Sequence, residues 1–370
     1  MKWKKDSFFD NIETIYKSQE LKPIIALKNC IVKEADKCIP ISAVSKRGLE
    51  LDVPIKVAKF LRQYPSIFQE FVGPEYNLPW FRLTKEAVEL HNEEELVYRE
   101  RREDIVDGLK RLILMSEGRK LPLKIVKGMQ WYLGLPDEYL KDPEGNLDSS
   151  FSLVDMGDGL RGLSVDSGEK VLSTLQRNAV KRGVCLDDSW MPLAFPLYPS
   201  KGLRLKVKIS NWLDEFQKLP YVSPYEDCSN LNRSCEVFEK RVLGVLHELL
   251  SLFVDHSAER KKILCLRTYL DLPQKFYKAF DRHPHIFYLS LRNKTCTAIL
   301  KEAYDHDSAI DAHPVLNVRE KYIRLMKKSD AILKTRRQKN SLSAELGKLN
   351  TDVDKDCAAG NIGEALVFDL

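Results

Sequence analysis

The stretch Leu51-Asp52-Val53-Pro54, followed by Pro65 eleven residues later, recurs as Leu270-Asp271-Leu272-Pro273, followed by Pro284 at the same spacing. Proline is tolerated in the first turn of a helix and disfavours helical backbone in the residue before it. Each proline pair therefore predicts a short helix, over 54–65 and over 273–284. A shorter copy, Leu133-Gly134-Leu135-Pro136, lies between them. A repeated unit decides the architecture, so the surroundings of each copy indicate the fold.

The same order of elements surrounds all three copies. Apolar residues at helical spacing predict helices, and β-branched or aromatic runs bounded by Gly and Pro predict hairpins. Around the first copy the predicted helices are 1–36, 39–48 and 54–65, and the hairpin joins 67–72 to 80–84. Around the third copy they are 236–254, 261–269 and 273–284, with a hairpin of 285–291 and 295–300. The middle copy is a variant, with helices 94–116 and 120–132, a short post-proline helix and a hairpin of 151–155 and 160–165.

Three helices followed by a two-stranded wing are typical of a winged-helix domain. The predicted fold class is an α-rich α+β protein of three degenerate winged-helix-like units, each a helix-turn-helix plus a β-hairpin. The alternative is a plain helical domain with incidental hairpins. The predicted domains are an N-terminal helix with the first unit, the middle variant unit, an ordered connector, the third unit, and a basic then acidic mobile tail. Their bounds are 1–90, 91–165, 166–235, 236–328 and 329–370.

Composition indicates a globular chain with an uneven distribution of charge. The 370 residues are 44% hydrophobic and 31% charged, and no apolar run approaches the ~20 residues of a membrane span. Net charge is +5, but 321–340 hold eight Lys or Arg and one Asp, whereas 341–370 hold two Lys and six acidic residues. The rest is nearly balanced, so a polyanion site has to be a local patch. No signal or transit peptide is recognisable at the start of this chain.

The motifs of common enzymes and metal sites are missing from the sequence. Eight scattered cysteines without a C-x-x-C pair predict reduced, mostly buried thiols. No phosphate-binding glycine loop, GxSxG or HExxH occurs. The pair in His283-Pro284-His285 is better explained by a histidine at a helix end, where a cation is favourable, than by a metal site. We therefore predict no catalysis, no cofactor and no metal.

Basic residues gather on the two proline-bracketed helices. At 100° per residue they fall away from the apolar side, which is how a helix-turn-helix presents its third helix to a phosphate backbone. The middle copy is acidic at this place, and its helix is expected to be structural. The alternative is the charged face that any surface helix has. With the cations of the two wings, the predicted nucleic-acid-binding residues are Lys56, Lys59, Arg62, Arg82, Lys275, Lys278, Arg282, Arg292 and Lys294.

Wing aromatics and one alternating stretch leave two interpretations open. Trp80, Phe81, Phe287 and Tyr288 could stack on unpaired bases or pack into the core, because side chains alternate along a strand. Basic and apolar residues alternate over 201–209. This pattern fits either a strand with a basic face or the start of an amphipathic helix.

Several of these motifs resemble, in order, the plant organelle RNA recognition (PORR) domain family. The resemblance covers roughly residues 3–328. It rests on the Pro54–Pro65 helix, Trp80–Ala87, Leu121-Pro122, Leu133–Pro136, Leu219–Tyr225 and His283–Tyr288, with Trp3–Asp6 resembling the N-terminal edge of the domain.

The resemblance implies an RNA-binding protein of plant mitochondria or chloroplasts that supports splicing of group II introns. It supplies no catalytic residues. It also implies an organelle presequence that is absent from this chain, and mitochondria are the favoured compartment, with the chloroplast as the alternative. The expected partners are group II intron RNA, single-stranded or structured, and other splicing factors, but no membrane. The competing hypotheses are a tandem winged-helix DNA-binding protein and a protein–protein scaffold.

Overall fold

The computed structural model describes residues 4–73, 78–157, 159–166, 168, 170–184, 191–200, 206–293, 295–306 and 310–358, with backbone only from 341 onward. The chain divides into two compact units, each assembled from two separate stretches of sequence. Unit 1 comprises residues 1–22 and 92–320, and unit 2 comprises residues 23–91 and 321–370.

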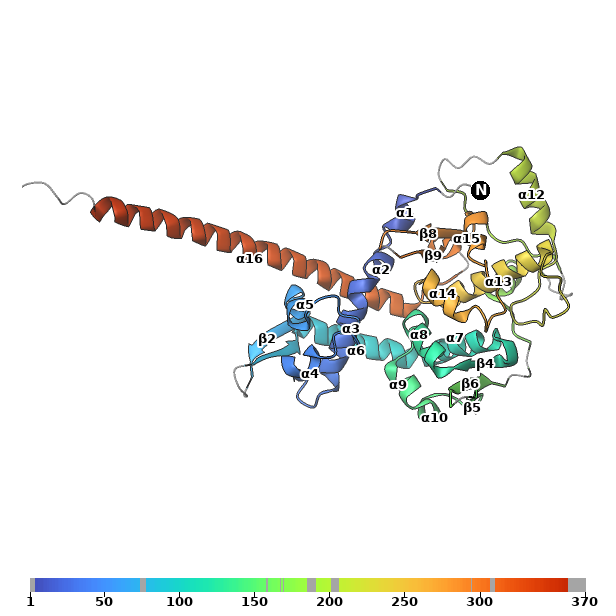
Figure 1. Cartoon of the computed structure of the whole chain (residues 1–370), viewed down its shortest axis with the longest axis horizontal. Helices are drawn as coiled ribbons and strands as arrows, with labels where there is room; N and C mark the ends of the chain where they lie inside the picture. Colours follow the sequence, from blue (N-terminus) through green and yellow to red (C-terminus); the bar gives the residue numbers. More distant parts are fainter. Residues whose placement is uncertain are drawn as a thin grey trace, which may run out of the picture. The chain divides into compact units, whose positions relative to one another are not determined.

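Three copies of one arrangement account for most of the elements (Figure 1). Each copy, here called a repeat, runs helix, short strand, helix, helix, strand, strand. Repeat 1 consists of α3 (Ser18–Lys33), β1 (Cys38–Pro40), α4 (Ile41–Ser45), α5 (Val57–Gln63), β2 (Phe68–Val72) and β3 (Pro79–Leu83). Repeat 2 consists of α7 (Arg102–Leu114), β4 (Lys120–Pro122), α8 (Leu123–Leu133), α9 (Asp137–Lys141), β5 (Phe151–Asp155) and β6 (Arg161–Val165). Repeat 3 consists of α13 (Glu236–Leu252), β7 (Ser257–Glu259), α14 (Arg260–Leu266), α15 (Lys278–Arg282), β8 (Phe287–Ser290) and β9 (Thr297–Leu300).

The other elements connect or flank the repeats. They are α1 (Ser7–Asp10), α2 (Glu13–Tyr16), α6 (Lys85–Glu100), η1 (Glu117–Arg119), α10 (Pro143–Asn146), α11 (Thr174–Lys181), α12 (Val207–Lys218), η2 (Lys301–Tyr304) and α16 (Pro314–Ala358). The α-rich α+β class is as predicted. For the alternating stretch 201–209, residues 207–209 open helix α12, whereas 201–205 lie outside the described residues.

Each repeat contains a three-stranded antiparallel sheet whose last strand lies in the middle. The orders are β1-β3-β2, β4-β6-β5 and β7-β9-β8. The three predicted hairpins are confirmed as β2–β3, β5–β6 and β8–β9. The sequence does not predict the first strand of each sheet, because three residues are too few to show strand alternation. These strands are held by their partners: Ile39 of β1 lies opposite Phe81 of β3, and both side chains are buried.

Two residues with left-handed backbone recur at the same places in every repeat. One directly precedes the first strand, and the φ values are 52° at Lys37, 50° at Arg119 and 45° at His256. The other stands two residues before the recurring proline, with φ of 53° at Asp52, 68° at Gly134 and 47° at Asp271. The next amide then donates to the carbonyl five residues back, at 2.8 Å for Val53 to Gly48, 3.0 Å for Leu135 to Gln130 and 2.9 Å for Leu272 to Arg267. This closure is typical of a helix C-terminus, so the repeated motif marks where the preceding segment stops.

The helices after the repeated prolines are shorter than the sequence predicts. α5 covers only Val57–Gln63 and α15 only Lys278–Arg282. In repeat 3, hydrogen bonds to the third residue back, from Phe276, Lys278 and Ala279, wind this part of the chain as successive turns. The predicted helix 94–116 is also wrong as one element, since α6 ends at Glu100 and α7 begins at Arg102. No Gly or Pro marks that break.

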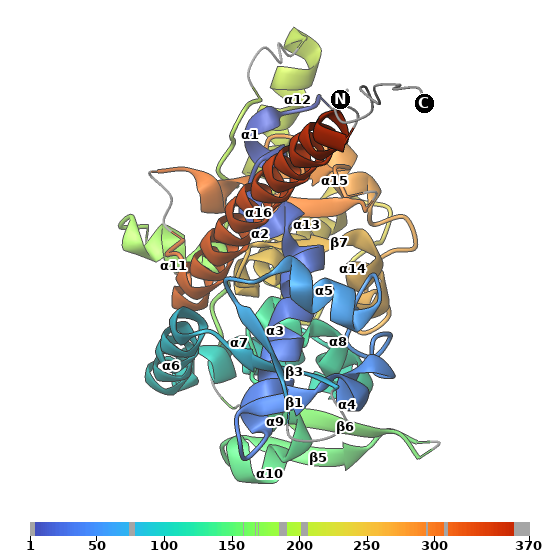
Figure 2. The same ribbon diagram turned by 90° about the vertical axis from the view of Figure 1, so that its left-hand side faces the viewer.

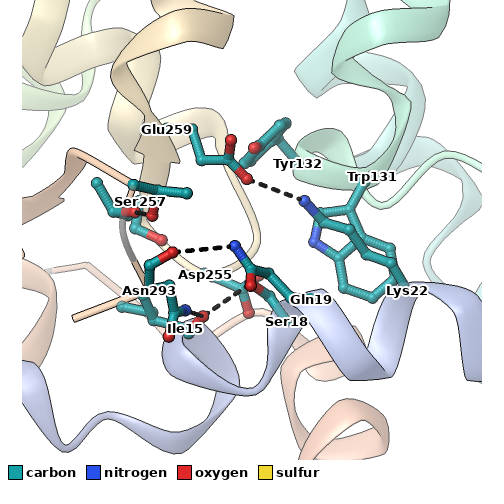
Figure 3. A pocket seen from close by; sticks show the side chains of 12 residues that line it. Ile15, Ser18, Gln19, Lys22, Trp131, Tyr132, Asp255, Ser257, Glu259 and Asn293 are labelled. Carbon is teal, nitrogen blue, oxygen red and sulfur yellow. Dashed lines mark hydrogen bonds and ion pairs between the residues drawn. The ribbon is translucent and has the colours of Figure 1, made fainter. Parts of the chain in front are cut away.

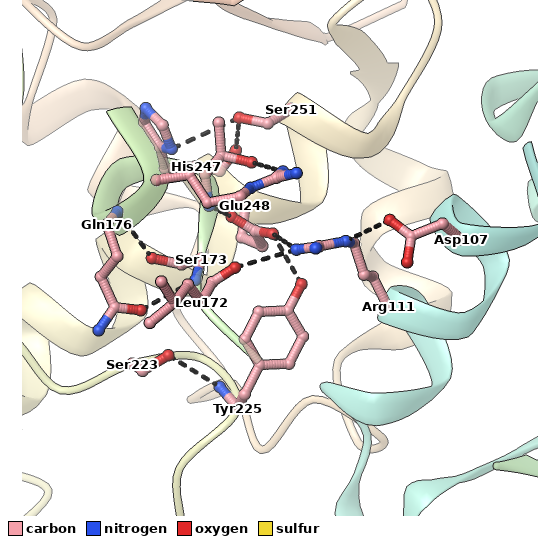
Figure 4. A network of polar contacts seen from close by, with 12 residues as sticks. Asp107, Arg111, Leu172, Ser173, Gln176, Ser223, Tyr225, His247, Glu248 and Ser251 are labelled. Carbon is pink, nitrogen blue, oxygen red and sulfur yellow. Dashed lines mark hydrogen bonds and ion pairs between the residues drawn. The ribbon is translucent and has the colours of Figure 1, made fainter. Parts of the chain in front are cut away.

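Repeats 2 and 3 pack together inside unit 1 around one hydrophobic core. α7 packs on α13, and α8 packs on α14. The predicted helix 236–254 is α13, and it is buried on nearly every side. Its buried carboxylate Glu248 has several polar partners. Glu248 accepts hydrogen bonds from the Thr174 amide at 2.5 Å and the Tyr225 hydroxyl at 2.7 Å, and Arg111 lies 3.7 Å away (Figure 4).

Unit 2 combines repeat 1 with the part of α16 beyond residue 320. Tyr322 and Met326 are buried, and the Ser66 hydroxyl donates to the Leu325 carbonyl at 2.5 Å and lies 2.6 Å from the Ser329 hydroxyl. α16 is thus anchored to the turn between α5 and β2. It also contacts α3, because the Lys28 ammonium lies 5.9 Å from the ring centre of Tyr322 (both helices are labelled in Figure 2). Helical backbone continues through 329–358, the described part of the tail 329–370 that we predict to be mobile. Its mobility stays a prediction.

The expectation of mostly buried cysteines is wrong for the described part of the chain. Five described thiols are half-buried and Cys265 is exposed. Cys265 faces solvent on α14, and Cys235 is the N-cap of α13, where its sulfur accepts from the Phe238 amide at 3.4 Å. None of the helices in the described ranges is long and apolar enough to cross a membrane.

Candidate nucleic-acid interface

Helix α5 carries a small basic surface in repeat 1. Its apolar side, centred on Phe60, is buried in unit 2. Lys56 and Lys59 are not buried, and no ion pair joins either one to a described residue. Arg62 is exposed as well, but its guanidinium donates to both carboxylate oxygens of Glu70, at 2.7 and 2.6 Å. The predicted trio therefore contains two free lysines and one paired arginine.

Repeat 3 presents a similar surface with a different backbone. Lys275 lies in the turns before α15, and Lys278 is the first residue of α15. Neither lysine is buried, and neither has an ion pair within the described ranges. Phe280 points into the core, which turns the lysines outward. Arg282 is paired with Glu239, at 3.0 and 3.2 Å from its two oxygens.

The free lysines occupy equivalent positions, two and five residues after the recurring proline. These positions hold Lys56 and Lys59 in repeat 1, Glu138 and Lys141 in repeat 2, and Lys275 and Lys278 in repeat 3. Two uncompensated positive charges thus recur in the first and third repeats, while the second carries a compensated pair of opposite signs.

Arg62 and Arg282, unlike the lysines, are each neutralised by an acidic partner. The hydrogen bonds from Arg62 hold the pKa of Glu70 below its ordinary value. The pKa of Glu239 is lowered mainly by its hydrogen bond with His283 and further by Arg282. Both carboxylates are therefore ionised at neutral pH and cancel the neighbouring guanidinium charge. His283 is buried at the C-cap of α15, consistent with the helix-end interpretation.

The predicted wing cations make structural contacts. Arg82 lies over the ring of Phe71, at 5.2 Å, and donates to the side chain of Gln69. Arg292 lies 4.0 Å from the ring centre of Tyr16 and donates to the carbonyl of Asp10 at 2.7 Å. In unit 1, Arg292 therefore fastens the N-terminal segment to the third wing. Lys294 lies outside the described residues.

Three of the four wing aromatics pack into the core, which decides between the two interpretations for these three residues. Phe81, Phe287 and Tyr288 are 1%, 1% and 2% exposed. The Tyr288 ring stacks on Phe9 at 5.2 Å, and its hydroxyl accepts from the Asp6 amide at 3.0 Å. Only Trp80 of the four is partly exposed. Base stacking by the three buried rings would require opening the core.

A small cavity in unit 1 is lined in part by Lys22. The Lys22 ammonium lies 4.9 Å from the ring centre of Tyr132, 5.6 Å from that of Trp131 and 3.7 Å from Glu259 (Figure 3). Burial lowers the pKa of Lys22, and Glu259 opposes this shift. The remaining volume of about 20 Å³ has room for about one water molecule. The cavity is too small for a nucleotide.

A larger cavity of about 200 Å³ lies between α11 and the end of α13. It is lined by His256, whose ring nitrogens have no hydrogen-bond partner among the described residues, and by His313, which accepts from the Val315 amide at 3.2 Å. Burial lowers the pKa of both imidazoles to about 4, so both are neutral at physiological pH. No group of three or more potential metal-binding side chains occurs in the part of the chain that the structure describes.

Comparison with known families defines the class of protein. The plant organelle RNA recognition domain matches residues 4–331, which include all three repeats. The chain belongs to this family, as its sequence motifs predict. The family description makes it an organellar RNA recognition protein.

Individual relatives add detail. "Protein WHAT'S THIS FACTOR 9, mitochondrial" of Arabidopsis thaliana is 60% identical over 96% of this chain and 92% of that protein. "Protein WHAT'S THIS FACTOR 1, chloroplastic" of Zea mays is 27% identical over 87% of this chain and 66% of that protein. "Protein ROOT PRIMORDIUM DEFECTIVE 1" of Arabidopsis thaliana is 26% identical over 95% of this chain and 88% of that protein. No solved structure matches the chain. The mitochondrial relative at 60% identity confirms the expected mitochondrial location.

Proposed function

We propose that this protein binds intron RNA in mitochondria and promotes splicing of group II introns without catalysis of its own. The observation that carries the proposal is the recurrence of two solvent-accessible lysines, without ion pairs to described residues, at equivalent positions of repeats 1 and 3. A lysine ammonium is a point charge suited to phosphate, and phosphate contacts position a protein on RNA without reading its sequence.

The proposal treats each repeat as a winged-helix-like unit. Its support is the order of helices and strands, with a short first strand at one edge of the sheet and a hairpin completing it. In this arrangement the third helix is the one offered to nucleic acid. α5 and the 275–282 segment would contact the RNA backbone, while the acidic α9 of repeat 2 would serve the fold. The paired Arg62 and Arg282, and the wing cations Arg82, Arg292 and Lys294, would contribute less.

Promotion of splicing follows from binding alone. If the protein binds the splicing-competent fold of an intron more tightly than other folds, it shifts the population toward that fold by the ratio of the two affinities. The intron RNA then supplies the chemistry. Such a role needs neither cofactor nor metal site in the protein.

The test is a fourfold substitution that removes the recurring charges and keeps helix propensity: Lys56→Gln, Lys59→Gln, Lys275→Gln and Lys278→Gln. Binding to a group II intron transcript is measured by gel shift across a range of salt. Because each phosphate contact contributes about 0.7 to the salt slope on single strands, the slope should fall by up to about 3. The matched control removes four other exposed cations: Lys46→Gln, Arg99→Gln, Lys141→Gln and Lys208→Gln. Equal losses in both variants would sink the assignment.

A binding competition between duplex DNA and RNA distinguishes the proposed function from two alternatives. A tandem winged-helix DNA-binding protein would prefer duplex DNA to single-stranded or structured RNA of equal length. A protein–protein scaffold would bind neither nucleic acid at low salt. The near-balanced charge of residues 1–320 weighs against duplex DNA, which carries the denser charge.

A further inference from the structure

A concentration of positive charge in unit 2 has no role in the interface described above. Residues 321–340 hold eight Lys or Arg and a single Asp, and all of them lie on α16. Helices on protein surfaces usually mix both signs of charge along the chain. A nearly pure basic segment on one helix therefore needs an explanation.

The basic segment runs from the core of unit 2 into solvent. Tyr322, Ile323 and Met326 are buried, and Ser329 is held by the Ser66 backbone amide at 3.2 Å. From residue 334 to residue 340 every side chain is exposed. This stretch of helix is therefore surrounded by solvent on all sides.

Several cations of the segment have no counter-charge. Lys328 is paired with Glu86 at 2.5 Å. By contrast, no ion pair joins Arg324, Lys334, Arg336 or Arg337 to any residue in the described ranges. At 100° per residue these four side chains project from different sides of the helix. Like charges three and four residues apart also repel and weaken the helix. A polyanion would remove this repulsion.

The chemistry of the segment fits RNA better than a protein surface. Protein interfaces are built around apolar or aromatic anchors, and Lys334-Thr335-Arg336-Arg337-Gln338-Lys339-Asn340 contains none. A helix that carries cations on every side can contact phosphates on more than one strand. The segment is also fixed near α5, because Ser66, in the turn directly after α5, bonds Leu325 and Ser329.

We propose that Arg324, Lys334, Arg336 and Arg337 of α16 form a second RNA-backbone site, which acts together with Lys56 and Lys59 of the same unit. This inference rests on the proposed function of the protein. Recognition is of phosphate and is independent of base sequence. Neutralisation of the repelling cations also orders the helix when RNA is bound.

The test removes the four cations without ion pairs in the full chain: Arg324→Gln, Lys334→Gln, Arg336→Gln and Arg337→Gln. A salt slope of about 0.7 per contact corresponds to about fourfold in affinity per contact at 0.15 M salt. Binding of a structured intron transcript at this salt should weaken at least about tenfold, and the salt slope should fall by about 1 or more. The control is the variant Lys46→Gln, Arg99→Gln, Lys141→Gln and Lys208→Gln, which should lose less than about twofold because its cations belong to neither site and distant charges are screened by salt.

A second readout follows the helix itself. Hydrogen exchange of the amides in 330–340 should slow when the wild-type protein binds RNA, and this protection should be lost in the α16 variant. Unchanged RNA affinity in that variant would overturn the proposal and would point to an acidic protein as the partner of the segment. An equal loss in the control variant would also overturn it, because net charge would then explain the effect. If the wild-type protein binds no RNA at low salt, the proposed function itself fails.

Discussion

Tyr132 and Tyr269 occupy the same position in repeats 2 and 3, and the backbone carbonyl of each accepts a hydrogen bond from the other repeat. The Val254 amide donates to the Tyr132 oxygen at 2.7 Å, and the Glu117 amide donates to the Tyr269 oxygen at 2.7 Å. Val254 and Glu117 are also equivalent, since each stands three residues before the first strand of its sheet. Unit 1 is therefore built from two copies that pair through one self-complementary contact.

Repeat 1 carries different side chains at the positions that surround this backbone contact. Glu50 takes the place of the two tyrosines, and Arg47 takes the place of Met129 and Leu266. Arg47 and Glu50 form an exposed ion pair, with both N–O distances at 3.0 Å. A charged pair at these positions cannot reproduce the buried contact of unit 1, because burying it against an apolar surface would cost its hydration.

Substitution of Gly134 tests how closely repeats 2 and 3 approach each other. Its φ of +68° is unfavourable for other residues, and an added Cβ would lie 2.8 Å from the Val254 side chain. Gly134→Ala should therefore lower the free energy of unfolding by about 2 kcal/mol, as the sum of backbone strain and overpacking. Urea unfolding followed by circular dichroism measures the change.

The matched control is Gly128→Ala in α8, where no atom lies within 4 Å of an added Cβ. Inside a helix this substitution should stabilise by about 0.5–1 kcal/mol. Wild-type stability in Gly134→Ala would show that the two repeats do not approach as described.

The sequence predicts the parts of this fold that have strong local signals. Paired prolines bracket the two short helices, and Gly-bounded aromatic runs give the three hairpins. The first strands escape prediction because three residues such as Lys120–Pro122 show no period and depend on distant partners. The sequence also cannot show which cations of the site have a partner, because these partners are distant in the chain. Glu239 lies 43 residues from Arg282, and Asp10 lies 282 residues from Arg292, so tertiary packing alone decides which cations stay free.

Glu70 restrains a cation that the interface could use. The substitution Glu70→Gln removes this negative charge and should release Arg62 beside Lys59. RNA affinity should then rise about two- to fourfold at 0.15 M salt, because Arg62 could make one added phosphate contact. Glu50→Gln is a matched control, because it frees Arg47 of another exposed pair, just after α4, and changes net charge equally. Stability should change by less than about 1 kcal/mol in both variants, since exposed ion pairs contribute little. Equal gains in affinity from both substitutions would show a net-charge effect, not a local site.

Arg319 compensates a buried charge in unit 1. Its guanidinium lies 2.6 Å from Asp255 and 3.9 Å from the ring centre of Trp131, and the side chains of both Arg319 and Asp255 are nearly inaccessible. Arg319→Met leaves the Asp255 carboxylate without this partner and should cost about 3–5 kcal/mol of unfolding free energy. The double variant Arg319→Met with Asp255→Asn should recover part of the loss. A full loss in the double variant would assign the effect to the Trp131 contact instead.

His256 should make the protein less stable in mild acid. Burial lowers its pKa from 6.5 to about 4 in the folded state, so between these values the unfolded chain binds a proton that the folded protein does not. Stability is therefore lost as pH falls from about 6.5 towards 4, by on the order of 3 kcal/mol in total for this group. His313 acts in the same direction. Thermal unfolding between pH 7 and pH 5 should show a falling Tm. His256→Asn, whose side chain tolerates the φ of 45°, should flatten that dependence in part, whereas His306→Asn at an exposed position should leave it unchanged. If wild type and His256→Asn lost stability equally over this range, the buried imidazole would not be its source.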